Sequence, residues 1–184
     1  MNLKIEHFKE IGSTSDYALN LVSSTALRSD YAILADIQTA GRGRLGNRIW
    51  VSVDGNFHCT YIVNIRDLSI SKSQVVSLNF SVVNAMRQFL CDIIGTDGID
   101  IKLPNDILIK GRKIAGALTE VSYPYAAIGI GMNLTKSPIE NSTDILSESK
   151  ISIKPMDIVE NLYRLLLRNI NLLKTSNNND DSDK

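Results

Sequence analysis

The chain has 184 residues, enough for one ordinary domain with a substantial core and too few for two domains of that size. Hydrophobic residues make up 43% and charged residues 22%, which is the composition of a soluble globular protein. Twenty basic residues balance twenty acidic ones, so no net charge attracts the chain to nucleic acid or to a membrane surface. No run approaches the ~18 apolar residues of a membrane helix, and the N-terminus lacks a signal-peptide core. We therefore expect a cytoplasmic protein.

The first elements are predicted from alternation and capping. Residues 3–11 alternate and predict a strand, and Ser13 and Asp16 are spaced as the N-cap and N3 residues of a helix that runs towards Val22. Residues 31–38 predict an apolar strand that leads directly into the loop TAGRGRLGNRIW, residues 39–50. Residues 57–65 predict another strand.

The second half of the chain predicts two long helices around further strands. An apolar stripe at helical spacing runs from about residue 73 to residue 94. Two strands follow, separated by residues 104–106, and Lys110-Gly111 is typical of a tight hairpin turn. After a strand over residues 125–134, a last helix is expected from Pro155 to about Leu173. Together these elements predict an α+β domain over residues 1–174, with a mixed sheet and helices largely on one side, and a disordered polar tail over residues 175–184.

Two of the strands carry unusually small residues. Alternation puts three residues of the strand over 125–134 on one face: Gly129, Gly131 and Asn133. Repeated glycines on one strand face indicate close approach by a ligand or by another backbone. On the strand after the hairpin turn, alternation groups Lys113, Ala115, Ala117 and Thr119. If the strands pair, we expect a shallow floor with a cation at one end and Asn133 at the rim.

The loop over residues 39–50 carries three arginines, namely Arg42, Arg44 and Arg48. Two anions ~4 Å apart, such as a carboxylate and the phosphate that it attacks, repel by about 4 kcal/mol at a surface-like dielectric. Lys113 and the loop arginines could cancel that repulsion, and Gly41, Gly43 and Gly46 would let the loop approach an anion closely. The loop matches neither the Walker pattern nor the dinucleotide fingerprint.

Five short motifs occur in order along the chain. They are Ser13-Thr14, Gln38-Thr39-Ala40-Gly41-Arg42-Gly43-Arg44, Lys102-x-Pro104-Asn105-Asp106, Gly111-Arg112-Lys113-Ile114-Ala115-Gly116 and Gly129-Ile130-Gly131-x-Asn133. Over roughly residues 1–173 the chain resembles the catalytic domain of biotin protein ligase, also called biotin–[acetyl-CoA-carboxylase] ligase or holocarboxylase synthetase. The resemblance implies the class II synthetase-like fold of the biotin and lipoate ligases, a mixed β-sheet flanked by helices.

The resemblance also implies an activity. Members of the family activate biotin with ATP and Mg²⁺ to biotinyl-5′-AMP, and they transfer biotin to a lysine of a biotin carboxyl carrier protein. No N-terminal helix-turn-helix is recognisable, so no nucleic-acid partner is expected. No C-terminal β domain is recognisable either.

Site residues follow from the same motifs. The resemblance implies three catalytic residues: Lys113, Arg42 and Arg44. It implies that biotin and ATP are bound by these three together with Ser13, Thr14, Ser15, Gln38, Gly41, Gly43, Trp50, Lys102, Asn105, Asp106, Gly116, Gly129, Gly131 and Asn133. The chain departs from the family pattern at Ser15, where Asn is common, and at Leu103, where Trp is common. Trp50 is six positions after Arg44, whereas the family's tryptophan is usually five positions after the corresponding arginine.

Several alternatives stay open at the sequence level. A degenerate homologue would bind biotin or biotinyl-AMP without transferring it. A lipoate ligase or octanoyl transferase shares the fold, and the transferases use a nucleophilic Cys, for which Cys59 and Cys91 are the candidates. If neither cysteine is a nucleophile, the spacing of Cys59 and Cys91 predicts two buried reduced thiols and no metal site held by the protein. Two further hypotheses are a nucleic-acid contact through the Arg/Gly loop and a homodimer formed through a sheet edge.

Overall fold

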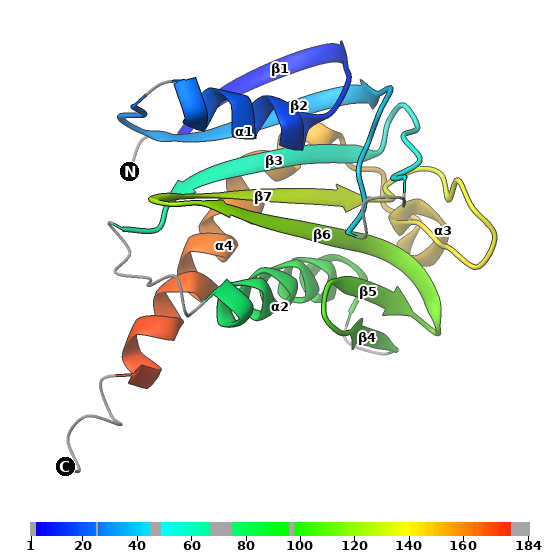
Figure 1. Ribbon diagram of the computed structural model, residues 1–184. Coiled ribbons are helices and arrows are strands. Elements are labelled where there is room, and N and C mark those ends of the chain that lie inside the picture. Colours follow the sequence, from blue (N-terminus) through cyan, green and yellow to red (C-terminus); the bar gives the residue numbers. More distant parts are fainter. Residues whose placement is uncertain (1–2, 25, 45–48, 67–74, 96–97, 178–184) are drawn as a thin grey trace.

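A mixed seven-stranded sheet is the centre of the molecule (Figure 1). The computed structural model describes residues 3–24, 26–44, 49–66, 75–95 and 98–177. The strands lie in the order β1-β2-β3-β7-β6-β5-β4; β1 pairs with β2 in parallel, and each of the other neighbouring pairs is antiparallel. Their bounds are β1 Leu3–Ile11, β2 Asp30–Gln38, β3 Phe57–Asn64, β4 Ile99–Lys102, β5 Asp106–Ile109, β6 Arg112–Ser122 and β7 Tyr125–Met132.

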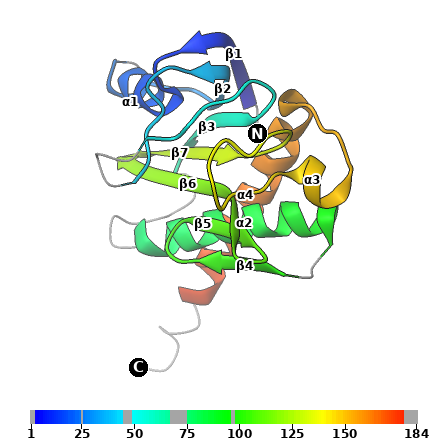
Figure 2. The same cartoon turned by 90° about the vertical axis from the view of Figure 1, so that its right-hand side faces the viewer.

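Helices cover both faces of the sheet. The long helices α2 (Val75–Ile94) and α4 (Pro155–Asn177) pack together on one face, and α1 (Thr14–Ser24) lies on the other, against β2, β3 and β7 (Figures 1 and 2). The short helix α3 (Ile145–Ser149) lies between β7 and α4 in the chain. No helix in the described part of the chain is long and apolar enough to cross a membrane.

Two hydrophobic cores result from this arrangement. The larger one lies between the sheet and α2 and α4, and the predicted core face of β7 is confirmed there, because Ile128, Ile130 and Met132 are buried in it. The smaller core joins α1 to β2, β3 and β7 through Ala18, Ile33, Ile62 and Ala127. Since the apolar side of α1 is occupied by this core, the first turn of the helix is held close to the sheet.

The ends of the elements follow the predicted local chemistry in most places. The backbone N–H of Asp16 donates to Ser13 Oγ at 3.3 Å, so Ser13 is the N-cap of α1. Lys110 and Gly111 have φ values of 49° and 78°, as a two-residue hairpin turn requires. Helix α4 runs past Leu173 to Asn177, so residues 175–177 of the predicted disordered tail are helical. Residues 178–184 of the predicted tail lie outside the described residues.

A β-bulge in β6 overturns one prediction about the strand faces. Ile107 pairs with Ala115 while Leu108 pairs with Lys113, so residue 114 is skipped in the ladder. The prediction that Lys113 shares a face with Ala115 and Ala117 is therefore wrong, because simple alternation does not hold across a bulge. Ala115 and Ala117 belong to the larger core instead, and the hydroxyl of Thr119 donates to Asn79 of α2.

Candidate active site

Glycines form the floor of a pocket on the α1 face of the sheet. Gly116 of β6 pairs with Gly131 of β7, and two residues further along Leu118 pairs with Gly129. A Cβ atom at any of the three glycines would meet another side chain of this protein at about 3 Å or less. The bare backbone at these positions is thus what lets functional side chains lie directly on the sheet.

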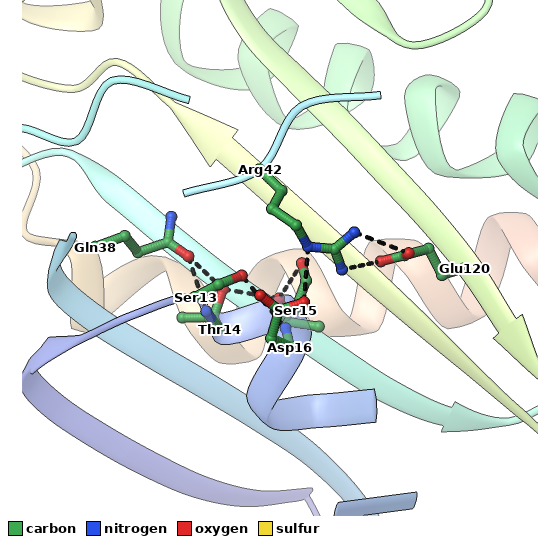
Figure 3. A network of polar contacts seen from close by, with 8 residues as sticks. Ser13, Thr14, Ser15, Asp16, Gln38, Arg42 and Glu120 are labelled. Carbon is green, nitrogen blue, oxygen red and sulfur yellow. Dashed lines mark hydrogen bonds and ion pairs between the residues drawn. The ribbon is translucent and has the colours of Figure 1, made fainter. Parts of the chain in front are cut away.

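Ser15, in the first turn of α1, lies over Gly129, where a Cβ atom would be 2.7 Å from its hydroxyl oxygen. Around it, Thr14 and Thr60 are joined by a hydroxyl–hydroxyl hydrogen bond of 2.8 Å, and Thr60 lies 3.2 Å from Ser15. The backbone N–H and hydroxyl of Thr14 both donate to Gln38 Oε1, at 2.8 and 3.0 Å (Figure 3). Of these residues Ser15 and Gln38 line the pocket, and Thr14 and Thr60 hold them from behind, so the wall here is neutral and can form hydrogen bonds.

Lys113 and Asp106 form an ion pair over Gly116. Their Nζ and Oδ1 atoms are 2.8 Å apart, and a Cβ atom at Gly116 would be 3.1 Å from each of them. Asn105 Nδ2 donates to the same Asp106 oxygen at 3.1 Å. The bulge in β6 returns Lys113 to the glycine face, so its cation lies at one end of the floor.

Trp50 lies on Gly131, the third glycine of the floor. A Cβ atom at residue 131 would be 2.8 Å from Cδ2 of the indole and closer still to its six-membered ring. The backbone of Trp50 is fixed at Gly41, whose carbonyl accepts its N–H at 2.9 Å. Lys113 Nζ is 5.5 Å from the centre of the indole ring, within range of a cation–π contact.

Arg42 is held by two carboxylates (Figure 3). Its two terminal nitrogens donate to the two oxygens of Glu120, at 3.1 and 2.6 Å. Its Nε lies 2.8 Å from Asp16 Oδ1, an ion-pair distance, although this contact lacks the geometry of a hydrogen bond. Two carboxylates around one guanidinium leave this cluster with one net negative charge.

These parts surround a single pocket of about 630 Å³, a size typical of small-molecule sites. The side formed by α1, β2 and the chain that follows β2 is lined by Ser15, Gln38, Arg42, Gly43, Arg44, Ile49 and Trp50. Its other side and floor are lined by Lys102, Leu103, Pro104, Asn105, Asp106, Lys113, Gly116, Ala117, Leu118, Gly129, Ile130, Gly131 and Ile139. The pocket is thus a slot with the Lys113 cation at Gly116 and the hydroxyls of Ser15 and Thr60 at Gly129.

More than half of the chain matches a known protein family. Residues 7–133 match the model of the biotin/lipoate A/B protein ligase family. The chain belongs to this family.

Relatives named as ligases are found in distant organisms. The chain is 29% identical over 159 residues to biotin--[acetyl-CoA-carboxylase] ligase of Mycobacterium tuberculosis, covering 85% of this chain and 59% of that protein. It is 35% identical over 133 residues to the bifunctional ligase/repressor BirA of Bacillus subtilis, covering 70% of this chain and 39% of BirA. The chain therefore spans little more than half the length of one relative and well under half of the other.

A solved structure has the same fold. The crystal structure of biotin protein ligase from Leishmania major in complex with biotinyl-5-AMP superposes with a TM-score of 0.77 at 27% identity. The match covers 94% of this chain and 75% of that one. The mixed sheet with flanking helices predicted from the sequence is thus confirmed as the fold of a biotin protein ligase catalytic domain.

Not all of the residues picked out by the family's motifs line the slot. Ser13, Thr14 and Gly41 lie behind the lining and support it through the cap, the hydrogen bonds to Gln38 and the contact with Trp50. Asn133 is buried instead of lying at the rim, because its side chain donates to the carbonyl of Thr143 at 3.0 Å. Arg48 and Gly46 lie outside the described residues.

Four residues that the sequence analysis did not select contact residues of the slot without lining it: Asp16, His58, Thr60 and Glu120. His58 and Thr60 pair with Gly131 and Gly129, so alternation along β3 could have put them on the slot face. His58 is 1% exposed, and burial lowers its pKa to about 4. Glu120 and Asp16 carry no sequence signal, because their role depends on a tertiary contact with Arg42.

The two cysteines lie away from the slot of this ligase-family domain. Cys59 is buried in the larger core, and its burial raises the pKa of the thiol well above the ordinary value. Cys91, on α2, is partly exposed, which differs from the prediction of two buried thiols. Neither is among the residues that line the pocket.

Proposed function

We propose that this chain is a biotin–[acetyl-CoA-carboxylase] ligase. It activates biotin with ATP to biotinyl-5′-AMP and transfers the biotinyl group to a lysine of a biotin carboxyl carrier protein. The proposal is supported by the family, by the ligase names of the relatives, and above all by one observation in the slot. That observation is the order of the groups along the glycine floor.

Along paired β6 and β7 the floor begins with Lys113 over Gly116 and continues to Ser15 over Gly129. An extended acid with a polar, uncharged head matches this order. Its carboxylate would meet Lys113, while the head would meet the hydroxyls and amide around Ser15. Biotin, with a ureido ring at one end and a carboxylate at the other, has this distribution of polar groups.

In the first step a biotin carboxylate oxygen forms a bond to the α-phosphorus of ATP, and the bond to pyrophosphate breaks. Both reacting groups are anionic, so a cation between them lowers their repulsion and stabilises the charge that develops on the phosphoryl oxygens. Lys113 would supply this cation, and Arg44 and Lys102 line the same pocket. In the second step the carrier amine attacks the biotinyl carbonyl, and AMP leaves.

Magnesium would enter with the phosphates of ATP. Asp106 is the one carboxylate that lines the pocket in the described part of the chain, and Mg²⁺ is usually held by one or two carboxylates together with substrate phosphates. This donor set fits a nucleotide-carried Mg²⁺ and does not form an all-protein cage. When bound, the ion neutralises phosphate charge.

The test is adenylate formation with competing acids. The chain is incubated with ATP, Mg²⁺ and either biotin, lipoate or octanoate, and the acyl adenylate is identified by mass spectrometry. We expect biotinyl-AMP and pyrophosphate with biotin alone, because the neutral wall favours a hydrogen-bonding head over a hydrocarbon chain. Formation of the octanoyl or lipoyl adenylate in preference to biotinyl-AMP would overturn the proposal.

A further inference from the structure

The backbone of Lys113 is held by a segment that follows β7 in the chain. Strand β7 ends opposite Ala115 of β6. Beyond that point residues 141–143, the bridge segment, run parallel to β6 beside Lys113. The N–H of Lys113 donates to the carbonyl of Asn141 at 3.0 Å, and its carbonyl accepts the N–H of Thr143 at 2.8 Å. The bridge segment therefore satisfies both backbone polar groups of Lys113.

These two hydrogen bonds support the bulge that sets the direction of the Lys113 side chain. A bulge interrupts the regular ladder, so its backbone groups depend on partners outside that ladder. In a regular strand Lys113 would share the face of Ala115, which packs into the larger core. Because of the bulge, the amine of Lys113 lies over Gly116 and beside Asp106 instead. The position of the amine thus depends on the bridge segment.

One carboxylate, that of Glu148 in α3, joins the bridge segment to β6. Its Oε1 atom accepts from the hydroxyl of Thr143 at 2.6 Å and from Nη2 of Arg112 at 2.6 Å. Arg112 is the residue directly before Lys113 on β6. The side chain of Glu148 is only 9% exposed, and a carboxylate with so little contact with water depends on such donors. Glu148 therefore ties together the two segments that lie next to the backbone of Lys113.

Helix α3 is itself firmly placed, as a support for Lys113 requires. Asp144 accepts from the N–H and the hydroxyl of Ser147 at 2.8 and 2.9 Å, which caps the helix. The carbonyl of Asn133 accepts the N–H of Ile145 at 3.1 Å, and the Asn133 side chain donates to the carbonyl of Thr143 at 3.0 Å. A side chain can orient another group only if its own position is fixed. Glu148 meets this condition.

We propose that Glu148 is a positioning residue for Lys113 that acts through Thr143 and Arg112. These three residues are not among those that line the slot, so Glu148 acts on the reaction through the position of the Lys113 amine. It differs in this from Asp106, which contacts the amine directly. The proposal rests on the proposed function for the reaction that is affected.

The first test is a double-mutant cycle on the rate of biotin-dependent pyrophosphate release. Glu148→Ala is made in the wild-type chain and in Lys113→Ala, and thermal unfolding gives the folded fraction of each variant. Asp30→Asn is the matched control, because it removes another carboxylate from a hydrogen-bond network. Asp30 accepts from the hydroxyl of Tyr163 at 2.6 Å and lies at the opposite end of β2 from Gln38.

We expect Glu148→Ala to slow pyrophosphate release about 10- to 100-fold, because a misplacement of about 1 Å can cost about 10²-fold in rate. In the Lys113→Ala background the same substitution should change the rate less than about twofold, since no amine is left to be misplaced. Glu148→Gln keeps an oxygen acceptor for Thr143 and Arg112 and should restore most of the rate. Asp30→Asn should lower the unfolding temperature without slowing the folded protein.

A loss by the same factor in both backgrounds would mean that Glu148 supports the domain as a whole, and it would overturn the proposal. A wild-type rate for Glu148→Ala would overturn it too. If Glu148→Ala does not fold, Thr143→Val takes its place, with Thr143→Ser as the variant that keeps the hydroxyl. The valine variant should then lose rate only where Lys113 is present, and the serine variant should not.

Lysine labelling separates this proposal from the proposed function. Wild type and Glu148→Ala are treated with limiting acetic anhydride in the absence of ATP and biotin, and acetylation of Lys113 is compared with that of exposed Lys154 by peptide mapping. We expect the ratio to rise several-fold in Glu148→Ala, because an amine that has left Asp106 is more accessible. An unchanged ratio would contradict the positioning role. A raised ratio in a chain that forms no biotinyl-AMP would refute the proposed function and leave the role of Glu148 in place.

Discussion

The indole of Trp50 and the backbone of Gly131 are in direct contact, with no space between them for a methyl group. The backbone of Trp50 is held as well, since its N–H donates to the carbonyl of Gly41 and a Cβ atom at Gly41 would be 2.7 Å from the carbonyl oxygen of Trp50. Two glycines from different parts of the sequence thus fix one tryptophan. This contact determines what covers the floor beside Lys113.

Gly131→Ala tests that contact. Alanine in a strand is ordinarily preferred to glycine by roughly 0.5–1 kcal/mol, but here its methyl group overlaps the indole, and overpacking typically costs about 1–3 kcal/mol. We expect a lower unfolding temperature and a red-shifted emission of Trp50, which is the only tryptophan of the chain. Gly12→Ala is the control, because nothing lies within 4 Å of a Cβ atom there. Unchanged emission from Gly131→Ala would contradict the packing described.

Lys113→Ala should slow biotin adenylation by about 10²–10³, the range for loss of one preorganised electrostatic group. The rate of biotin-dependent pyrophosphate release measures this effect, and Lys154→Ala, at an exposed position before α4, is the matched control. The substitution also leaves Asp106 without its ion-pair partner, so the unfolding temperature is recorded for both variants. Pyrophosphate release at the wild-type rate would remove Lys113 from the chemistry.

His58 predicts a dependence of stability on pH. Its pKa is about 4 in the folded chain, against an ordinary value of 6.5, so between these values the unfolded chain binds more protons than the folded one. The free energy of unfolding should therefore fall by about 3 kcal/mol as the pH is lowered from about 6.5 to 4. Above pH 6.5 His58 should add no further dependence on pH.

Urea unfolding of wild type and His58→Phe across that pH range measures this contribution. The variant should lose the slope. His7→Gln, at the other histidine of the chain, exposed and 2.6 Å from Asp36, should keep it. Equal slopes for wild type and His58→Phe would show that the buried imidazole is not the group that titrates.

The two cysteines distinguish a biotin ligase from an acyl transferase of the same fold. Because Cys59 is buried and its thiol pKa is raised, it lacks the thiolate character of a nucleophile. We expect Cys59→Ser and Cys91→Ser to retain adenylation within a few-fold, after correction for any unfolded protein. Loss of acyl transfer in either variant, with Lys113→Ala still active, would instead indicate a transferase that uses a covalent thioester.

Local patterns in the sequence predicted most of the fold. Alternation and capping specified β1, α1 and β2, and positive φ at Lys110 and Gly111 follows directly from the predicted turn. The short helix α3 was missed, because its five residues give too little periodicity, although Asp144 caps it by accepting from the N–H of Ser147. A helix this short is visible in sequence only through its cap.

The site was less predictable than the fold. Gly129 and Gly131 were recognisable because repeated glycines on a strand face are rare, whereas the face of Lys113 depended on a bulge that alternation does not reveal. The pairing of Arg42 with Glu120 joins residues 78 positions apart in the sequence, and no local pattern encodes it. The clustering of charges in the sequence therefore indicates the arginines of the loop but not the carboxylate that pairs with Arg42.

Labelling of a carrier tests the central claim most directly. The chain is incubated with biotin, ATP, Mg²⁺ and the apo form of a biotin carboxyl carrier domain, and the carrier is then analysed by mass spectrometry and peptide mapping. The account predicts one biotinyl group on one lysine, dependent on both ATP and biotin. Biotinyl-AMP that accumulates without labelling the carrier would contradict it, because the chain would then activate biotin without being a biotin–protein ligase.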